Sequence, residues 1–198
     1  MRLGASRRGA TAVEFAVVGA PFLFLLWCVL ELALVFIVGV NLSNATAGEA
    51  RQIRVGSVKA SGVSVTTSSG IQIDLADMKT AICNQIVLVP VATCVNQLQI
   101  DVRTMSNFTG SAPTSPISGS TFNASNLCYY SGGPGDIVEM RAYYLWTLDN
   151  PLLLSSMANI TTMTTGNGSS TGDWVVISDT EVMKTEAVPG LSNTGSGC

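Results

Sequence analysis

A long apolar segment near the start of the chain constrains what this sequence can fold into. It begins at Phe15 or Ala16 and continues to Val40, and Glu31 is the only charged residue within it. At about 1.5 Å per residue, a helix of roughly 25 residues is longer than a hydrocarbon core of about 30 Å. The sequence therefore predicts one membrane-spanning helix, with most of the chain outside the hydrocarbon.

The residues before this segment form a short basic leader. It contains Arg2, Arg7 and Arg8 and no acidic residue, so the positive-inside bias places it in the cytoplasm. Without these three arginines the 10 basic residues of the chain fall to seven, against 13 acidic ones. An acidic exported part has no evident use for nucleic acid. We therefore expect a single pass with a cytoplasmic N-terminus, an extracytoplasmic C-terminal part and no nucleic-acid partner.

The junction between leader and span contains a glycine and, five residues later, a glutamate. A carboxylate at the edge of a membrane span costs free energy unless a partner offsets it. Cleavage between Gly9 and Ala10 would give Ala10 a free ammonium group, and Glu14 could pair with that group on a neighbouring copy when helices assemble in lipid. This spacing resembles that of type IV prepilins.

A secretory signal peptide is the main competing interpretation, because Ala45 and Ala47 form an acceptable small-x-small cleavage site. Signal cores are usually about 7–15 residues long, much shorter than this segment, and they have no reason to contain Glu31. An unpaired charge near the bilayer centre costs about 2.5–3.5 kcal/mol on insertion scales. We therefore expect Glu31 to be protonated or paired with another chain, unless helix tilt brings it near the outer interface.

Residues 8–18, followed by Pro21, resemble the RGAxAVEFAxxxP opening of TadE-like proteins, the pseudopilins or minor pilins of the tight-adherence (Flp) pilus system. Later segments are similar more loosely. The family usually has arginine where Lys184 stands and a Glu-Pro pair where this chain has Glu186 and Ala187. The more loosely similar segments are residues 30–32, 44–56, 133–138, 143–146 with Pro151, and 180–186.

The resemblance implies a bacterial inner-membrane protein that takes part in pilus biogenesis. A dedicated prepilin peptidase would cleave it between Gly9 and Ala10, and Glu14, Phe15 and Glu31 would serve in recognition or assembly. The implied partners are that peptidase, other pilin and pseudopilin subunits reached through the N-terminal helix, the inner-membrane pilus platform and membrane lipid. The protein would stay anchored or become part of the pilus.

The chain divides into three predicted parts: a leader at 1–9, a transmembrane and pilin-like helix at 10–56, and an extracytoplasmic head at 57–198. Gly56 is a plausible stop for the helix. Hydrophobic periodicity in the head predicts one helix and several strands, separated by a Ser/Thr/Gly-rich loop at 106–126. The fold class is therefore α+β, a long helix joined to a head with an antiparallel sheet and a packed helix. The predicted helix covers residues 74–87, and the strands cover 63–67, 98–103, 137–146, 175–177 and 181–186, the last two perhaps forming one bent strand.

Four cysteines lie outside the predicted span, and an even number in an exported domain indicates disulfides. They are Cys83, Cys94, Cys128 and Cys198. Of the three possible connectivities, Cys83–Cys94 is favoured because it closes a short loop between the predicted helix and the next strand, and Cys128–Cys198 then follows. A metal site is the alternative, but CxxC pairs are missing. Cys28, within the span, is expected to be an inert small hydrophobe.

Catalysis finds little support in this sequence. The chain has no histidine, which removes the commonest general base and metal ligand. The aspartates, Asp101 among them, are scattered, and solvated or capping roles are their default; a calcium site near Asp173 and Asp179 is conceivable. We therefore expect no enzyme activity, no cofactor and no catalytic residue.

The function that we infer from the sequence is structural: a membrane-inserted minor pilin or pseudopilin that acts in pilus assembly, initiation or tip formation. One alternative is an uncleaved, membrane-anchored scaffold of the pilus secretion machinery. Another is a secreted adhesive domain released by cleavage after Ala47. The mature N-terminal residue separates these three hypotheses, since it would be Ala10, Met1 or Gly48 respectively.

Overall fold

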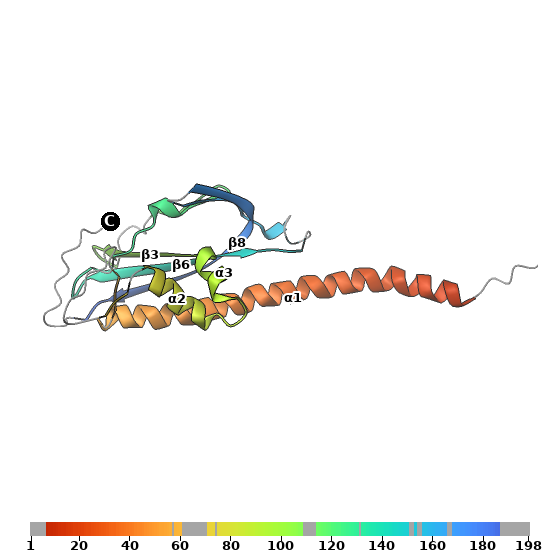
Figure 1. Ribbon diagram of the computed structural model, residues 1–198, viewed down its shortest axis with the longest axis horizontal. Helices are drawn as coiled ribbons and strands as arrows, with labels where there is room; N and C mark the ends of the chain where they lie inside the picture. The colour runs from red at the N-terminus through yellow and green to blue at the C-terminus, as the bar shows by residue number, and fades with distance from the viewer. Residues whose placement is uncertain are drawn as a thin grey trace, which may run out of the picture.

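A long helix and a mixed sheet make up the fold (Figure 1). The computed structural model describes residues 7–56, 58–60, 71–73, 75–108, 114–130, 132–150, 153, 156–165 and 168–186. The helix, α1 (Arg7–Arg54), packs its C-terminal part on the head and extends far beyond it at the N-terminal side. The predicted α+β class is therefore confirmed.

The head places short helices and strands in the following chain order. They are β1 (Val58–Ala60), β2 (Ile71–Ile73), α2 (Leu75–Gln85), α3 (Val91–Gln97), β3 (Leu98–Met105), β4 (Ile117–Ser118), β5 (Thr121–Asn123), the 3-10 turn η1 (Ala124–Asn126), β6 (Ile137–Thr147), β7 (Ile160–Thr165) and β8 (Gly168–Lys184). The main sheet has the strand order β3-β6-β8-β7-β5-β4, and β1 and β2 form a separate parallel pair.

The strongest predicted elements are confirmed and the weaker ones need correction. The predicted strands at 98–103 and 137–146 are β3 and β6, and the two C-terminal segments belong to the single strand β8. The predicted helix is α2, although Asp74 and the predicted strand at 63–67 lie outside the described residues. The sheet is not purely antiparallel, because β5 pairs with β7 in parallel. The prediction did not include α3 or β7, and the expected loop at 106–126 contains β4, β5 and η1.

The main core lies between the C-terminal half of α1 and the three strands β3, β6 and β8. Val38, Leu42, Ala45 and Ile53 of α1 are buried there, at intervals that keep them on one side of the helix. α2 and α3 add Met78, Ile82, Ile86 and both cysteines of the disulfide described below to the same core. The helix ends after Arg54, where Gly56 adopts a φ of 70° that favours glycine.

Strand β8 turns a corner and takes part in both halves of the sheet. Its first residues pair with β7 and its remaining residues pair with β6, and Trp174 belongs to both pairings. Figure 1 shows the strands beyond this corner folded back over the face of the sheet that lies away from α1. A second, smaller core fills the space between the two halves; it consists of Phe122, Tyr143, Leu145, Ile160 and Trp174.

The disulfide between Cys83 and Cys94 ties the end of α2 to the middle of α3, with a Cα–Cα distance of 5.7 Å. This is the pairing that the sequence analysis favours. The other predicted bridge, Cys128–Cys198, is not described because Cys198 lies outside the described residues. Cys28 is reduced and buried.

Asp101 forms a buried ionic cluster with two arginines, so the solvated role expected for it is wrong. It is fully buried on β3, opposite Arg141 of β6 in the strand register. One carboxylate oxygen accepts from Arg141 and the other from Arg103 and from the Cys128 N–H (2.7 Å). Arg141 also lies over the ring of Tyr143, with 5.9 Å between the guanidinium carbon and the ring centroid. Removing one partner from such a cluster leaves the other charge buried without compensation.

Gly172 gives a direct test of the corner in β8. A Cβ added there would lie 2.6 Å from Cζ2 of Trp174, so Gly172→Ala must displace the indole ring from the smaller core. We expect the free energy of unfolding, measured by urea denaturation of the full chain in detergent, to fall by about 1–3 kcal/mol. Gly48→Ala is the matched control, because Gly48 is exposed in α1 and a Cβ there meets nothing closer than 4.0 Å; we expect it to stabilise by about 0.5–1 kcal/mol. Equal stability of Gly172→Ala and the unsubstituted protein would contradict the close packing at the corner.

Candidate functional site in the N-terminal helix

The N-terminal half of α1 exposes a long apolar surface. Large hydrophobic side chains are exposed from Val13 to Val40, and Phe15 is the most exposed of those on the helix, at 79%. One helix in the described part of the chain is long and apolar enough to cross a membrane; its candidate span lies within Ala12–Arg54, with a mean hydropathy of 2.7 in the most apolar window. An apolar surface of this size requires lipid or other protein to cover it.

The predicted processing and recognition residues lie at the start of this surface. Gly9 and Ala10 belong to the first turns of α1. Glu14 is exposed and forms no ion pair or hydrogen bond with any residue that the structure describes. The ring of Phe15 lies over Gly19, where an added Cβ would be 3.6 Å from it. The structure thus leaves the Glu14 carboxylate available to a partner outside the chain.

Glu31 lies on the same helix but is buried by the head of its own chain. Its Oε1 accepts a hydrogen bond from the Asp149 N–H at 2.7 Å and a longer one from the Asn150 N–H at 3.4 Å. These donors come from the segment that follows β6, so the partner of Oε1 is backbone of the same chain. Oε2 is also buried and has no hydrogen-bond partner within the described residues. A contact between Oε2 and another chain therefore stays a prediction.

Asn150 makes a second contact with α1 that the sequence analysis missed. It is fully buried, and its Nδ2 lies 3.0 Å from Sγ of Cys28, one helical turn before Glu31. Cys28 and Glu31 are thus covered by one short segment, residues 148–150, more than 100 positions away in the sequence. Two polar side chains in an apolar helix were the only signal of this contact, and they do not identify the segment that covers them.

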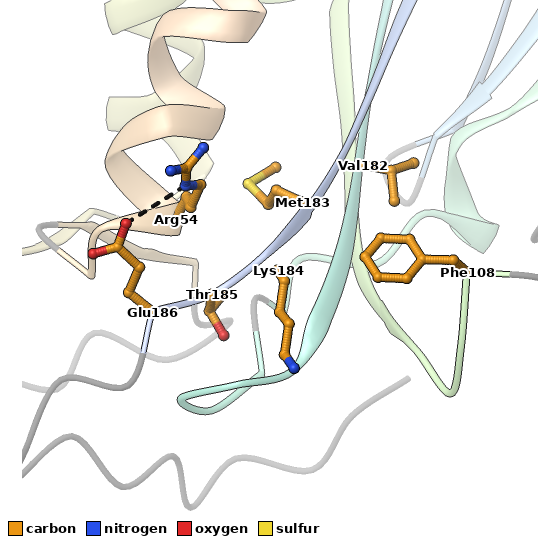
Figure 2. A pocket seen from close by; sticks show the side chains of 7 residues that line it. All are labelled: Arg54, Phe108, Val182, Met183, Lys184, Thr185 and Glu186. Carbon is orange, nitrogen blue, oxygen red and sulfur yellow. Dashed lines mark ion pairs between the residues drawn. The ribbon is translucent and has the colours of Figure 1, made fainter.

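A pocket lies at the opposite end of the head, where α1 and β8 both end (Figure 2). Its volume is about 460 Å³. Arg54 and Glu186 form an ion pair on one side of it, with 3.6 Å between Arg54 Nε and Glu186 Oε1. Phe108 lies on the other side, and the residues of the β8 end separate the two sides. The remaining lining residues are Val182, Met183, Lys184 and Thr185.

Ionisable groups in the described residues form no cluster suited to metal binding; no three side chains of His, Cys, Asp or Glu come together there. Asp173 and Asp179, named above as a conceivable calcium site, both lie within β8. Burial lowers the pKa of Lys79, whose Nζ donates to the Gln99 side chain at 3.2 Å. Burial also raises the pKa of Tyr144 to about 12. Both groups belong to the packing of the head, away from the exposed part of α1.

Glu31 allows a test of how the head is held against the helix. Glu31→Ala removes the acceptor of the Asp149 and Asn150 N–H groups, and a buried donor without a partner costs about 1–3 kcal/mol. We expect amide hydrogen exchange at these two positions to become at least fivefold faster for the chain in lipid nanodiscs. Glu31→Gln keeps an acceptor oxygen and should change little, and Leu30→Ala, at an exposed position, serves as the control. Unchanged exchange in Glu31→Ala would show that the contact does not hold residues 148–150.

Comparison with known proteins finds one match. The family of TadE-like proteins matches residues 9–51, which begin at the proposed cleavage site and include nearly all of α1. No curated protein and no solved structure matches the chain significantly. The match thus includes Glu14, Phe15 and Glu31 and leaves out the head with its pocket. Over residues 9–51, the segment that forms the exposed apolar surface and part of the main core, the chain is similar to TadE-like proteins.

Proposed function

We propose that this chain is a minor pilin, or pseudopilin, of the Tad pilus system, which inserts in the bacterial inner membrane and acts in pilus assembly, initiation or tip formation. The TadE-like match supports involvement in that system and a structural role. The single observation that carries the finer proposal is the division of α1. Its N-terminal half is apolar and exposed and contains an unpaired carboxylate, whereas its C-terminal half is core of the head.

The length of the exposed half supports a defined position in the membrane. Ala10 and Glu31 are separated by about 31 Å along a helix that rises 1.5 Å per residue, which is close to the thickness of a hydrocarbon core. With Ala10 at the cytoplasmic boundary, Glu31 lies at the outer boundary, and residues 148–150 cover it there. The basic leader then lies in the cytoplasm and the head outside.

Helix association would supply the assembly contact. After cleavage between Gly9 and Ala10, the Ala10 ammonium of one subunit pairs with the Glu14 carboxylate of a neighbouring pilin or pseudopilin. In a low-dielectric environment this pairing compensates two charges that would each be costly alone. The partners in this proposal are the prepilin peptidase, other pilin subunits, the membrane platform of the pilus and lipid.

Packing of α1 speaks against a secreted domain released after Ala47. Such a cut would remove Val38, Leu42 and Ala45, each of which is fully buried in the main core. Deleting even one large buried side chain typically costs about 2–5 kcal/mol, so a head without this helix segment would lose much of its stability. An uncleaved scaffold keeps the core intact and differs from the minor pilin only in processing.

Processing can be tested at Gly9. Gly9→Val should block cleavage, because the branched side chain does not fit a peptidase that requires a small residue, and the precursor should remain membrane-bound at its full mass. Intact-mass spectrometry of the purified chain measures this. Gly4→Val, at the other leader glycine, should be cleaved normally. A Gly9→Val protein with the mass of the mature form would refute the proposed cut site, and a precursor mass for the unsubstituted protein would favour the uncleaved scaffold.

Assembly can be tested at Glu14. Glu14→Gln keeps the size of the side chain but removes the charge, so a neighbouring Ala10 ammonium would be left unpaired at a cost of several kcal/mol. The variant should be cleaved and folded, yet it should no longer co-purify with partner pilins or support pili. Leu30→Gln puts the same amide at another exposed position of α1 and should retain assembly. Normal pili formed with fully cleaved Glu14→Gln would mean that the ammonium–carboxylate pair is not required.

A further inference from the structure

We propose that the outer edge of β8, from Ser178 to Lys184, is a docking site for an extended segment of a different polypeptide. That segment adds to the sheet as one more strand and places an apolar and an acidic side chain in the pocket at the end of β8. In recognition of this kind, main-chain hydrogen bonds give affinity and side-chain pockets give specificity. The docking site lies in the head and does not depend on cleavage or on the contacts of the membrane helix.

Hydrogen bonds at both ends of the segment show which backbone groups of β8 face outward. The Thr185 N–H donates to the loop before β6, whereas the Glu186 N–H donates to the Arg54 carbonyl at 2.8 Å, on the opposite side of the strand. The Val176 N–H also points away from β6, to the Asn159 side chain. The register with β6 is unbroken between these points. Since successive residues of a strand alternate in direction, the even-numbered residues face outward.

Four outward-facing residues therefore form a free edge. Ser178, Thr180, Val182 and Lys184 are exposed, and their outward N–H and C=O groups have no partner within the described residues. β7 pairs with β8 only as far as Trp174 and leaves the rest of this edge open. At about 3.3 Å per residue the edge is roughly 20 Å long, which suits a strand of about seven residues.

The pocket described above lies along this edge. Five consecutive residues, 182–186, line it, although alternate side chains of a strand point to opposite faces. One cavity can meet both faces only around an edge that no strand occupies, and β6 occupies the other edge of β8. Figure 2 shows Val182 and Phe108 on one side of the strand and Met183 and Arg54 on the other. A strand added at the free edge would therefore carry side chains directly into the pocket.

The pocket lining indicates what these side chains are. Phe108 and Val182 are 62% and 46% exposed, so an apolar side chain would bury surface that is now in water. Arg54 and Glu186 neutralise each other. Lys184 has no ion pair within the described residues and gives the pocket a net positive charge. An acidic side chain complements it.

A second copy of this chain does not suit the edge. β8 runs in the same direction as α1, since Ile177 lies against Gly39 and Glu186 bonds to Arg54. Two copies anchored in one membrane share that direction, so their free edges would meet in parallel about a twofold axis along the strands. The axis would place the outward residues of both copies directly opposite each other. A parallel ladder is evenly staggered and needs one outward and one inward residue at each level.

Amide hydrogen exchange of the full chain in lipid nanodiscs tests the docking site, with the synthetic heptapeptide Thr-Val-Thr-Val-Thr-Leu-Glu as the probe. In the free protein we expect fast exchange at the four outward residues and slow exchange at their inward neighbours Asp179, Glu181 and Met183. Saturating peptide should slow the outward amides at least fivefold and leave the inward ones unchanged. Slow outward exchange in the free protein, or no protection by the peptide, would overturn the proposal.

Two pairs of variants test the backbone and the charge separately. Thr180→Pro removes one outward donor, which an edge strand tolerates, and should abolish peptide protection, whereas Thr180→Val should keep it. Lys184→Glu should weaken binding of this peptide at least tenfold and favour the same peptide ending in lysine; Arg51→Glu, an equal charge change at an exposed residue outside the pocket, should not.

The variants also separate the remaining outcomes. If inward exchange shows that Thr180→Pro unfolds, the Lys184 and Arg51 pair decides. Equal peptide affinity of Lys184→Glu and Arg51→Glu would overturn the assigned acidic chemistry. Outward amides that become protected as protein concentration rises, without peptide, would show that the occupant is a second copy and would overturn the assignment to a different polypeptide.

Discussion

The packing of one face of α1 against β3, β6 and β8 is the interaction on which the rest of the structure depends. Val38, Leu42 and Ile53 reach the sheet from this helix, and α2 and α3 complete the same core. The hydrophobic effect that stabilises the head outside the membrane thus acts on the same helix whose other half is exposed and apolar. A head of this size would otherwise need another element to cover that face of its sheet, since a sheet must bury its apolar face.

Two polar arrangements hold elements that apolar packing alone would leave loosely placed. Asp101 joins Arg141 and Arg103 on the face of the sheet that lies away from α1, and it also accepts from the backbone of Cys128. Glu31 similarly accepts from the segment after β6. In each case a buried carboxylate receives directed hydrogen bonds from a distant segment, and such bonds to a charged acceptor are stronger than neutral ones. They therefore specify which segments lie together.

Sequence reasoning predicted those parts of the fold in which one local signal dominates. The apolar run of α1 and the alternation in β3 and β6 have clear periods, and Gly56 marks a helix end. It missed β7 because Ile160–Thr165 is mostly threonine, which is as common in loops as in strands. It missed α3 because seven residues carry too little periodicity to stand out, although Cys94 in it is buried.

The candidate site was predictable to a similar extent. Gly9, Ala10, Glu14 and Phe15 were found by their spacing before an apolar run. The cover on Glu31 was not, because contacts between residues more than 100 positions apart leave no trace in local pattern. The free edge of β8 was also hidden, since alternation shows that a strand exists but does not show which strands lie beside it.

The unbroken course of α1 from Arg7 to Arg54 has a consequence for how this protein can be arranged among its neighbours. Each residue of a helix turns the chain by about 100°, and there is no hinge between the exposed half and the half inside the head. The direction in which Glu14 points around the helix axis is therefore set once and for all relative to the direction in which the free edge of β8 faces. A neighbour that contacts the helix in the membrane meets a predetermined side of the head, so the molecule acts as a key whose shaft and bit are cut from one piece.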